Sequence, residues 1–417
     1  MKTNFFKYAA FAVVAALAAV SCSKDDDPVA PSVEADLIGT QTADVVTLTA
    51  NGSYTLSGKY IVPYGKTLKI EEGVTITAID DNTADYILIQ QGATIEAIGT
   101  QSNPIVMTSQ LKEAGAWGGI HICGYAKINS TSGHGVSEVG DSTYGGSDDT
   151  DNSGTLKWIR IEYAGYIINE GKEANGFTFY GVGNGTTLEY LHAYEGADDG
   201  FEWFGGCVNA KYLISTNNQD DSFDWTEGYR GTVQYAIANQ TNELCARLIE
   251  GDNDDSVNTV TPQSCPTFAN VTLIGKNSGN DDDQGVRIRV GSKVRLLNVL
   301  ISGKTTSLRV SDTESIEQFD AALTAGYVAG IYVDGTVNTG GSVSTTGLIN
   351  TQDFSSVLSN TYYGTIATSL SSNYASVNSA IASEQTGSPV NSTLATAGAT
   401  FAGAIATGAT WASALEL

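Results

Sequence analysis

The chain has 417 residues and a formal net charge of −25, from 46 acidic and 21 basic side chains. It contains 46 Gly and only 7 Pro, and long runs of helix-forming residues are scarce, so the composition favours an all-β fold. A surface this acidic repels polyphosphate, and we therefore expect no nucleic-acid partner. It is compatible with a soluble extracellular surface and with divalent cations.

The first 21 residues have the pattern of an export signal. Lys2 and Lys7 supply a positive n-region, and residues 8–20 form an apolar run of 13 that is too short to span a bilayer. The run ends in Ala-Val-Ser-Cys, which resembles a lipobox, the motif in which a cysteine (here Cys22) is diacylated and becomes the first residue. The alternative is an ordinary signal peptide with an incidental cysteine, and we favour the lipoprotein.

Residues 22–36 are charged and contain Pro, which predicts a lipid-anchored, disordered tether. The acidic cluster Asp25-Asp26-Asp27 lies close behind Cys22 and resembles the surface-export signal of Bacteroidota lipoproteins. This resemblance implies a protein anchored by lipid to the outer membrane and facing the cell exterior.

From residue 37 to about residue 310 the sequence is a succession of short strands. Pieces of four to six residues alternate between apolar and polar side chains and end at Gly or Asn. Gly65, Gly73 and Gly92 each begin a Gly-x-Thr motif, which places a Gly at a corner and a β-branched residue just inside it. This rhythm predicts a solenoid of parallel strands.

Residues 187–208 and 209–230 are two consecutive copies of one pattern, with an offset of 22. The pairs are Tyr190/Tyr212, Leu191/Leu213, Asp198/Asp220, Asp199/Asp221, Phe201/Phe223, Glu202/Asp224 and Trp203/Trp225. A period of this size between Gly and Asn turns indicates a solenoid coil of about 22 residues. Phe179, also 22 residues before Phe201, would stack with it in an internal ladder, and Trp203 and Trp225 share the inward parity.

These strands, together with Trp117-Gly118-Gly119-Ile120 and residues 158–165, resemble exported right-handed parallel β-helix proteins, in particular surface lipoproteins of Bacteroidota. The resemblance covers most of the mature chain and implies a right-handed parallel β-helix with a C-terminal cap. It is weak for function, because this architecture carries lyases, hydrolases, adhesins and coat proteins.

Three insertions interrupt the coils, at residues 127–153, 167–173 and 251–263. Insertions of this kind usually collect on one face and carry function. Ser311 to Glu314 reads as a capping box before a helix-like segment. We predict that residues 311–417 form a cap that covers the open edge of the last coil.

Four cysteines remain beyond Cys22, namely Cys123, Cys207, Cys245 and Cys265. An even number in an oxidising compartment permits two disulfides. Cys245 and Cys265 flank the third insertion, so we predict that they pair.

The strongest candidates for a chemical role in this chain are Asp198, Asp199, Asp220 and Asp221. On adjacent coils their carboxylates would lie about 4.8 Å apart, so they repel unless they are neutralised. Three outcomes are open: a bound Ca²⁺, hydrogen bonds from backbone N–H groups at the turn, or protonation for acid–base work. We favour a structural or calcium-binding role and predict calcium as the one candidate cofactor.

The catalytic alternative is a polysaccharide lyase or glycoside hydrolase, with the same four aspartates and Arg230 as its catalytic residues. Parallel β-helix pectin-degrading enzymes either bind Ca²⁺ with aspartates and use a basic residue as the base, or use clustered Asp for hydrolysis. Arg287 and Arg289 faintly resemble the Arg-Ile-Lys of polygalacturonases. No Gly-His-Gly follows the Asp pairs, so the hydrolase pattern is incomplete.

The sequence thus predicts a non-enzymatic surface lipoprotein that presents a rigid β-helix for coat or layer formation, adhesion or glycan binding. This prediction allows three kinds of partner: a glycan, a host or cell-surface ligand, or further copies of the chain. The alternative function is the carbohydrate-active enzyme described above. Asp254-Asp255 and Asp281-Asp282-Asp283 are expected to be solvated loop residues.

Overall fold

A computed structural model describes residues 36–81, 83–169, 171–254, 257–279, 283–354, 365–385 and 393–415. The predicted signal peptide, Cys22 and the tether up to residue 35 lie outside the described residues. Val33–Leu417 form one compact unit, and the description below concerns this unit alone. Within the described ranges, no helix has the length and apolarity that a membrane crossing needs.

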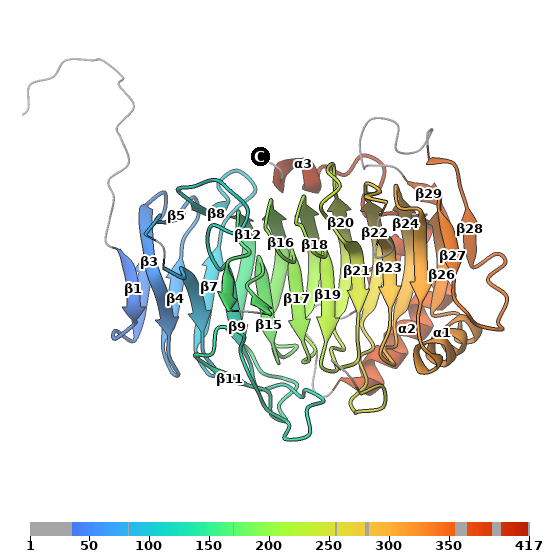
Figure 1. The fold of residues 1–417 in the computed structure, drawn as a ribbon, viewed down its shortest axis with the longest axis horizontal. Coiled ribbons are helices and arrows are strands. Elements are labelled where there is room, and N and C mark those ends of the chain that lie inside the picture. The colour runs from blue at the N-terminus through green and yellow to red at the C-terminus, as the bar shows by residue number, and fades with distance from the viewer. Residues whose placement is uncertain are drawn as a thin grey trace, which may run out of the picture. The chain divides into compact units, whose positions relative to one another are not determined.

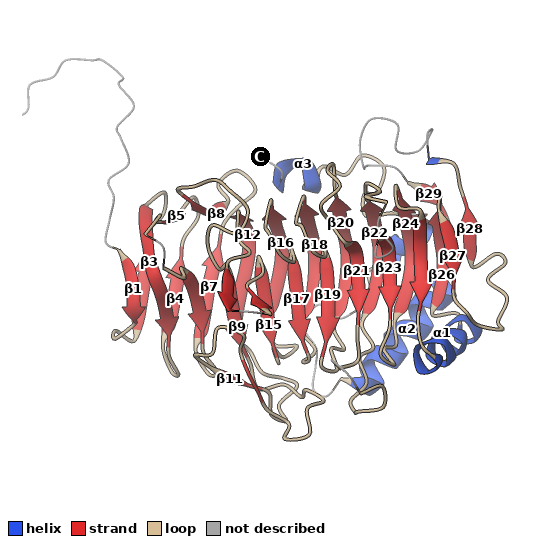
Figure 2. Cartoon of the chain, viewed as in Figure 1, coloured by secondary structure: helices blue, strands red, loops and turns tan. Residues whose placement is uncertain are grey.

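The unit is a right-handed parallel β-helix, as the sequence predicted (Figure 1). Each coil contributes strands to three parallel sheets, and apolar side chains from all three fill the interior. Figure 2 shows how completely strands dominate, with helices only beside the stack. Burial alternates along strands such as β4 (Thr67–Ile70) and β5 (Thr75–Ala78), with one residue inward and the next partly exposed. Period-two geometry predicts this alternation.

The first sheet begins with β2 (Val45–Leu48), β4 (Thr67–Ile70) and β7 (Thr94–Ile98). The second begins with the first half of β3 (Ser53–Val62), β5 (Thr75–Ala78) and β8 (Ile105–Ser109). From β12 onward one long strand serves both sheets: β12 (Gly154–Glu162), β16 (Thr187–Tyr194), β18 (Asn209–Thr216), β20 (Thr232–Asn239), β22 (Thr267–Ile274), β24 (Arg295–Ser302) and β26 (Val328–Val333), with β28 (Ile349–Thr351) after it.

The third sheet carries the candidate site. It contains β1 (Leu37–Thr40), the second half of β3, β6 (Tyr86–Ile89), β9 (Ile120–Cys123), β15 (Phe177–Tyr180), β17 (Phe201–Phe204), β19 (Phe223–Thr226), β21 (Arg247–Gly251), β23 (Gln284–Ile288), β25 (Thr306–Val310) and β27 (Thr336–Asn338). Three short antiparallel pairs lie outside the sheets: β10 (Gly135–Val136) with β11 (Thr143–Tyr144), β13 (Ile167–Asn169) with β14 (Lys172–Glu173), and β29 (Ile366–Ala367) with β30 (Phe401–Ala402).

The 22-residue offset is the true register between β17 and β19. Phe201 pairs with Phe223 and their rings stack at 5.5 Å, while Trp203 pairs with Trp225. All four side chains are buried, which confirms the inward prediction. The predicted partner of Phe201 one coil earlier was wrong: Phe177, not Phe179, stacks on Phe201 at 5.0 Å, because the preceding coil is two residues longer.

A second aromatic ladder marks the corner where the first and second sheets merge into long strands. Trp158, Tyr190, Tyr212 and Tyr235 all adopt positive φ near +60° and stack successively at 4.0, 4.4 and 5.1 Å. Non-Gly residues seldom adopt this conformation, so the repeated stacking is what holds the bend. Asn270 occupies the same corner position in β22.

The predicted boundary at residue 311 was wrong, because the β-helix continues beyond it. Helix α1 (Thr313–Ala325), with Asp312 as its N-cap, is an insertion, after which β26, β27 and β28 add further coil. The remaining described segment runs back along the outside of the merged sheets, through α2 (Ser371–Glu384), η2 (Thr396–Thr400) and α3 (Trp411–Leu415). Corner amides hold it, since Asn270 Nδ2 donates to the Gly398 and Phe401 carbonyls.

The predicted disulfide between Cys245 and Cys265 is contradicted, because all four described cysteines are free. Cys245 lies in the core just before β21 of the third sheet, and its thiol donates to the Arg247 carbonyl at 3.0 Å. Cys265 precedes β22, at a different corner of the coil. Flanking an insertion in the sequence did not place the two cysteines together, because strand β21 (Arg247–Gly251) also lies between them and spans one side of the coil.

Candidate functional site: an outward row of carboxylates

The outer face of the third sheet carries a row of acidic side chains at the centre of the chain. Phe201 and Trp203 point into the core, so Glu202 between them points outward, and the same holds for Asp224 on β19. The register Glu202–Asp224–Glu250 places one carboxylate on each of three successive strands. Glu202 and Asp224 were recognised in the sequence as a repeat pair but not as site residues.

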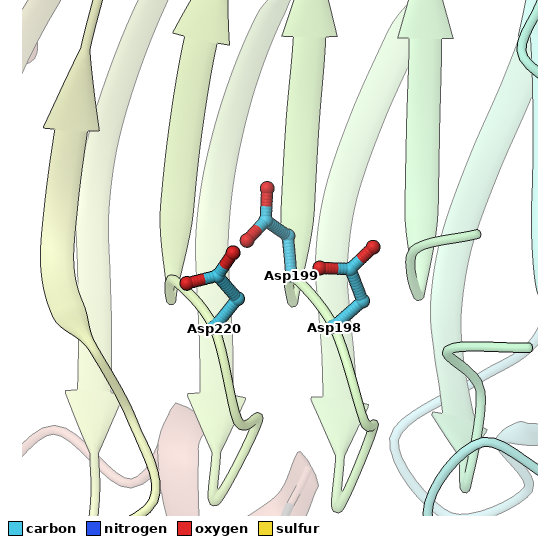
Figure 3. Close-up of side chains that lie close together, drawn as sticks. All are labelled: Asp198, Asp199 and Asp220. Carbon is cyan, nitrogen blue, oxygen red and sulfur yellow. The ribbon is translucent and has the colours of Figure 1, made fainter. Parts of the chain in front are cut away.

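The Asp pairs sit on the turns that lead into these strands, and they join the row. Asp198, Asp199 and Asp220 offer carboxylate oxygens that all lie within 4.8 Å of one another. Figure 3 shows Asp199 between Asp198 and Asp220. A second triad is formed by Asp199, Glu202 and Asp224, within the same 4.8 Å limit. Asp199 is therefore shared by both triads.

Burial makes this crowding electrostatically costly. Asp198 and Asp199 are only 9% and 6% exposed. Burial, followed by the neighbouring Asp220 carboxylate, raises the pKa of Asp198 to about 8. Burial and the Asp198 carboxylate raise the pKa of Asp199 well above its usual range. For Asp224 the pKa is raised by burial and by Glu250. Without a counter-charge, protonation of these groups is therefore favoured relative to that of an isolated carboxyl group.

The insertion at residues 127–153 contributes to this burial. Its apolar residues Ile128, Val139 and Tyr144 pack against Tyr180 on the outer face of the third sheet. Glu138 of the same insertion accepts a hydrogen bond from the Tyr180 hydroxyl at 3.3 Å. After burial, Glu138 is the largest cause of the raised pKa of Glu202. The insertion thus adds a further carboxylate to the edge of the row.

The geometry fits a hard divalent cation. Ca²⁺ takes six to eight oxygen ligands at about 2.3–2.6 Å, so two ligands of one ion lie at most about 5 Å apart, and both triads satisfy this limit. Asp221 and Asp224 each have a buried Oδ1 without a hydrogen-bond partner among the described residues. The Asp221 N–H donates to Asp199 Oδ1 at 2.8 Å, so one backbone hydrogen bond neutralises the Asp199 carboxylate in part.

Asp221, predicted as a fourth ligand, is in neither triad. It is 2% exposed, and its Oδ2 lies 3.8 Å from Arg247 Nη1. Asp221 therefore links the acidic row to a basic group on the next strand. Burial and Asp220 raise its pKa, and Arg247 opposes the rise.

Beyond Asp224 the outward face changes from acidic to basic. Arg247 Nε lies 2.9 Å from Glu250, and Arg289 Nη2 lies 2.6 Å from the same carboxylate. Arg289 also binds Asp252 at 2.8 Å. Arg287 follows Glu250 in the row, and Arg309 follows Arg287. Burial and the neighbouring arginines, Arg247 first, lower the pKa of Arg287.

Arg230 was the wrong candidate for the catalytic alternative. The Asp pairs precede their strands, whereas Arg230 follows β19, at the other end of the strand. Its guanidinium binds Asp149, with Nη2 to Oδ1 at 3.1 Å. Arg247, Arg287 and Arg289 lie on the acidic face instead, and of these the sequence had singled out Arg287 and Arg289.

The aromatic residues beside the carboxylates belong to the core. Trp203, Trp225 and Tyr229 are fully buried, which excludes them as a sugar-stacking platform. Phe204 is the exception, since it faces outward and stacks on Tyr180 at 4.8 Å.

His121 lies in β9, two strands from Glu202, where burial lowers its pKa to about 4.

The remaining acidic clusters were only partly interpreted correctly. Asp255, Asp281 and Asp282 lie outside the described residues. Asp254 is partly exposed. Asp283 was predicted to be solvated, but it is 5% exposed and pairs with the buried ammonium of Lys304. A lysine from the next coil reaches it, which sequence spacing does not reveal.

A family model described as a pectate-lyase-like β-helix domain matches residues 39–333. This range contains every residue of the acidic row. No curated protein and no solved structure matches the chain significantly.

Proposed function

Because the chain belongs to the pectate-lyase-like β-helix domain family, we propose that its outward carboxylate row binds an acidic glycan through a calcium ion. The observation that carries this proposal is the pair of carboxylate triads that share Asp199. Each triad supplies three of the six to eight oxygens that Ca²⁺ takes. On the side of Asp220, which is exposed, water or sugar oxygens would take the remaining positions, and the ion would bridge protein and glycan.

The charge pattern along the sheet favours a uronate-containing glycan over a neutral one. A cation at Asp199 neutralises the acidic end of the row. Arg287 and Arg309 continue the same row and are partly exposed. A guanidinium matches a carboxylate in a planar, bidentate geometry. A chain of sugar acids along the strands would meet calcium first and arginine next.

Glycan binding is tested by retention on immobilised polygalacturonate and on neutral dextran, with calcium or with EGTA. We expect retention on polygalacturonate in calcium only, and its loss in Asp199→Asn, which keeps the Oδ1 acceptor for the Asp221 N–H. Asp80→Asn, an exposed carboxylate on a distant turn, should bind like the wild type. Equal retention in EGTA would contradict the proposal.

The second candidate function is lyase cleavage of the same glycan. The specific observation is Arg287, whose pKa is lowered on a face that also holds the carboxylate triads. A lyase needs a base near the proton that it abstracts and a cation that stabilises the resulting charge. A hydrolase fits less well, because no Gly-His-Gly follows the Asp pairs.

Lyase activity is distinguished from binding by the ultraviolet absorbance of unsaturated uronate products. If the chain is a lyase, Arg287→Lys should lower product formation by at least about tenfold, a larger loss than the loss in calcium-dependent retention, to which the remaining positive charge at residue 287 still contributes. An absence of product from wild-type protein across uronic glycans would leave binding as the function.

We further propose that the protein acts at the cell surface through a lipid on Cys22, which lies outside the described residues. The export pattern and the following acidic cluster support this. Cys22→Ala should move the protein from the membrane fraction to the soluble fraction, as measured by immunoblot of separated fractions. Retention of the variant in the membrane fraction would reject the lipid anchor.

A further inference from the structure

A pocket of about 620 Å³ lies away from the acidic row, at the corner where the chain passes from the third sheet to the first. Residues 261–265 before β22, residues 293–295 at the start of β24, and one side of α1 form its walls. Arg230, the guanidinium that does not reach the acidic row, lines it as well. Pockets of about 300–1,000 Å³ are typical of small-molecule sites.

The walls of this corner pocket are cationic, in a chain whose net charge is −25. Lys127, Arg230, Lys293 and Arg295 line it, and Glu384 is the one carboxylate among the described lining residues. Arg230 and Arg295 are 8% and 4% exposed. Burying two guanidiniums in one pocket with further cations costs free energy unless anions accompany them.

The protein's own anions satisfy these cations only in part. Asp149 pairs with both Arg230 and Lys127. Arg295 pairs with Glu384 and donates to the Cys265 carbonyl at 3.3 Å. Within the described part of the chain, these four cations therefore have two carboxylates as ion-pair partners. The Nε atoms of Arg230 and Arg295 are buried and have no hydrogen-bond partner among the described residues.

Apolar groups complete the pocket. Val294, Ala322, Ala325 and Tyr327 line it beside the cations. The Arg295 guanidinium lies over the Tyr327 ring, 5.4 Å from its centroid, which holds the guanidinium in a fixed orientation. A site with an apolar wall and a few convergent cations suits a ligand that is part apolar and part anionic.

We infer that the corner pocket binds a small organic anion, in which a carboxylate or phosphate group meets Arg230, Arg295 and Lys293 while an apolar body lies against Tyr327 and α1. The planar forks of the arginines match either anionic group. This site is independent of the calcium-dependent glycan site, because no residue of the two triads lines it.

Cys265 provides a direct probe, because it lines the pocket and is the one partly exposed cysteine among the four described. The full-length chain carrying Cys22→Ala is treated with N-ethylmaleimide, and the modification rate of the Cys265 peptide is followed by mass spectrometry. Phenylacetate, phenyl phosphate and neutral benzyl alcohol are compared as protecting ligands. Inorganic phosphate tests the anion alone.

We expect phenylacetate or phenyl phosphate to slow modification of Cys265 in a saturable way, and benzyl alcohol not to. Protection by only one of the two identifies the anionic group. Lys293→Ala or Arg295→Lys should weaken protection about 10- to 100-fold, the effect of losing one charge-assisted hydrogen bond. Lys276→Ala, a half-exposed lysine paired with Glu243, should change nothing.

Three results would contradict the inference. If benzyl alcohol protected Cys265 as well as the aryl anions do, the pocket would be a purely apolar site that does not recognise the anionic group. Absence of protection by both aryl anions, while Cys265 still reacts with the reagent, would show that the pocket binds no such anion. Inorganic phosphate that protects as well as phenyl phosphate would contradict the role of the apolar wall.

Discussion

In the presence of EGTA, the protein should lose stability as the pH rises from about 5 to 8, and calcium should restore it. The pKa of Asp198 is raised from 3.8 to about 8, and those of Asp199, Glu202 and Asp224 are raised as well. A carboxyl whose folded pKa lies above its unfolded value binds more protons when folded. The stability that such a carboxyl contributes to the folded state is present at low pH and is lost as the pH rises through the folded pKa.

Calcium replaces these protons, so the loss should vanish when calcium is bound. The measurement is the midpoint of thermal unfolding at pH 5 and pH 8, with EGTA and with calcium. Asp199→Asn/Asp224→Asn should flatten the pH dependence in EGTA and abolish the calcium effect, whereas Asp80→Asn should behave like the wild type. A wild-type midpoint that is independent of pH and of calcium would contradict the claim that repulsion between the buried carboxylates destabilises the fold.

Replacement of Lys304 by Ala should destabilise the fold by about 3–5 kcal/mol, the cost of leaving one member of a buried ion pair alone. Lys304 and Asp283 have side chains that are 0% and 1% exposed. The ammonium also donates to the Cys245 carbonyl at 2.8 Å. Lys304 therefore connects its own coil to the coil that carries Cys245.

The free energy of unfolding is measured by urea titration of Lys304→Ala and of Lys304→Met, which keeps most of the side-chain volume. Both variants should be destabilised, since both leave the buried Asp283 carboxylate without its ion-pair partner. Lys276→Ala removes a half-exposed partner of Glu243 and should change stability by less than about 1 kcal/mol. A loss below about 1 kcal/mol in Lys304→Met would show that the pair is not needed.

The fold was predictable because its signals are local. The alternation of Phe201, Glu202 and Trp203 fixes which side chains face the core, and the 22-residue repeat fixes the register of β17 with β19. The error at Phe179 has a simple cause, since a coil two residues longer shifts the partner to Phe177. Periodicity within one repeat does not determine the length of its neighbour.

The candidate site was predictable only in part. The Asp pairs were evident, and the same parity that buried Trp203 implies that Glu202 and Asp224 face outward beside them. Arg247 was not accessible to this reasoning, because it reaches Asp221 from the next coil. The path of the C-terminal segment was equally hidden, since it depends on corner amides far away in the sequence, such as that of Asn270, which donates to the Gly398 carbonyl.

The central claim is that the shared carboxylates bind calcium, and calorimetric titration of the EGTA-treated, dialysed chain with CaCl₂ tests it most directly. We predict saturable binding that Asp199→Asn abolishes, because Asp199 belongs to both triads, and that Asp80→Asn leaves unchanged. Binding that is undiminished in Asp199→Asn, or no calcium binding by the wild-type chain, would contradict the account.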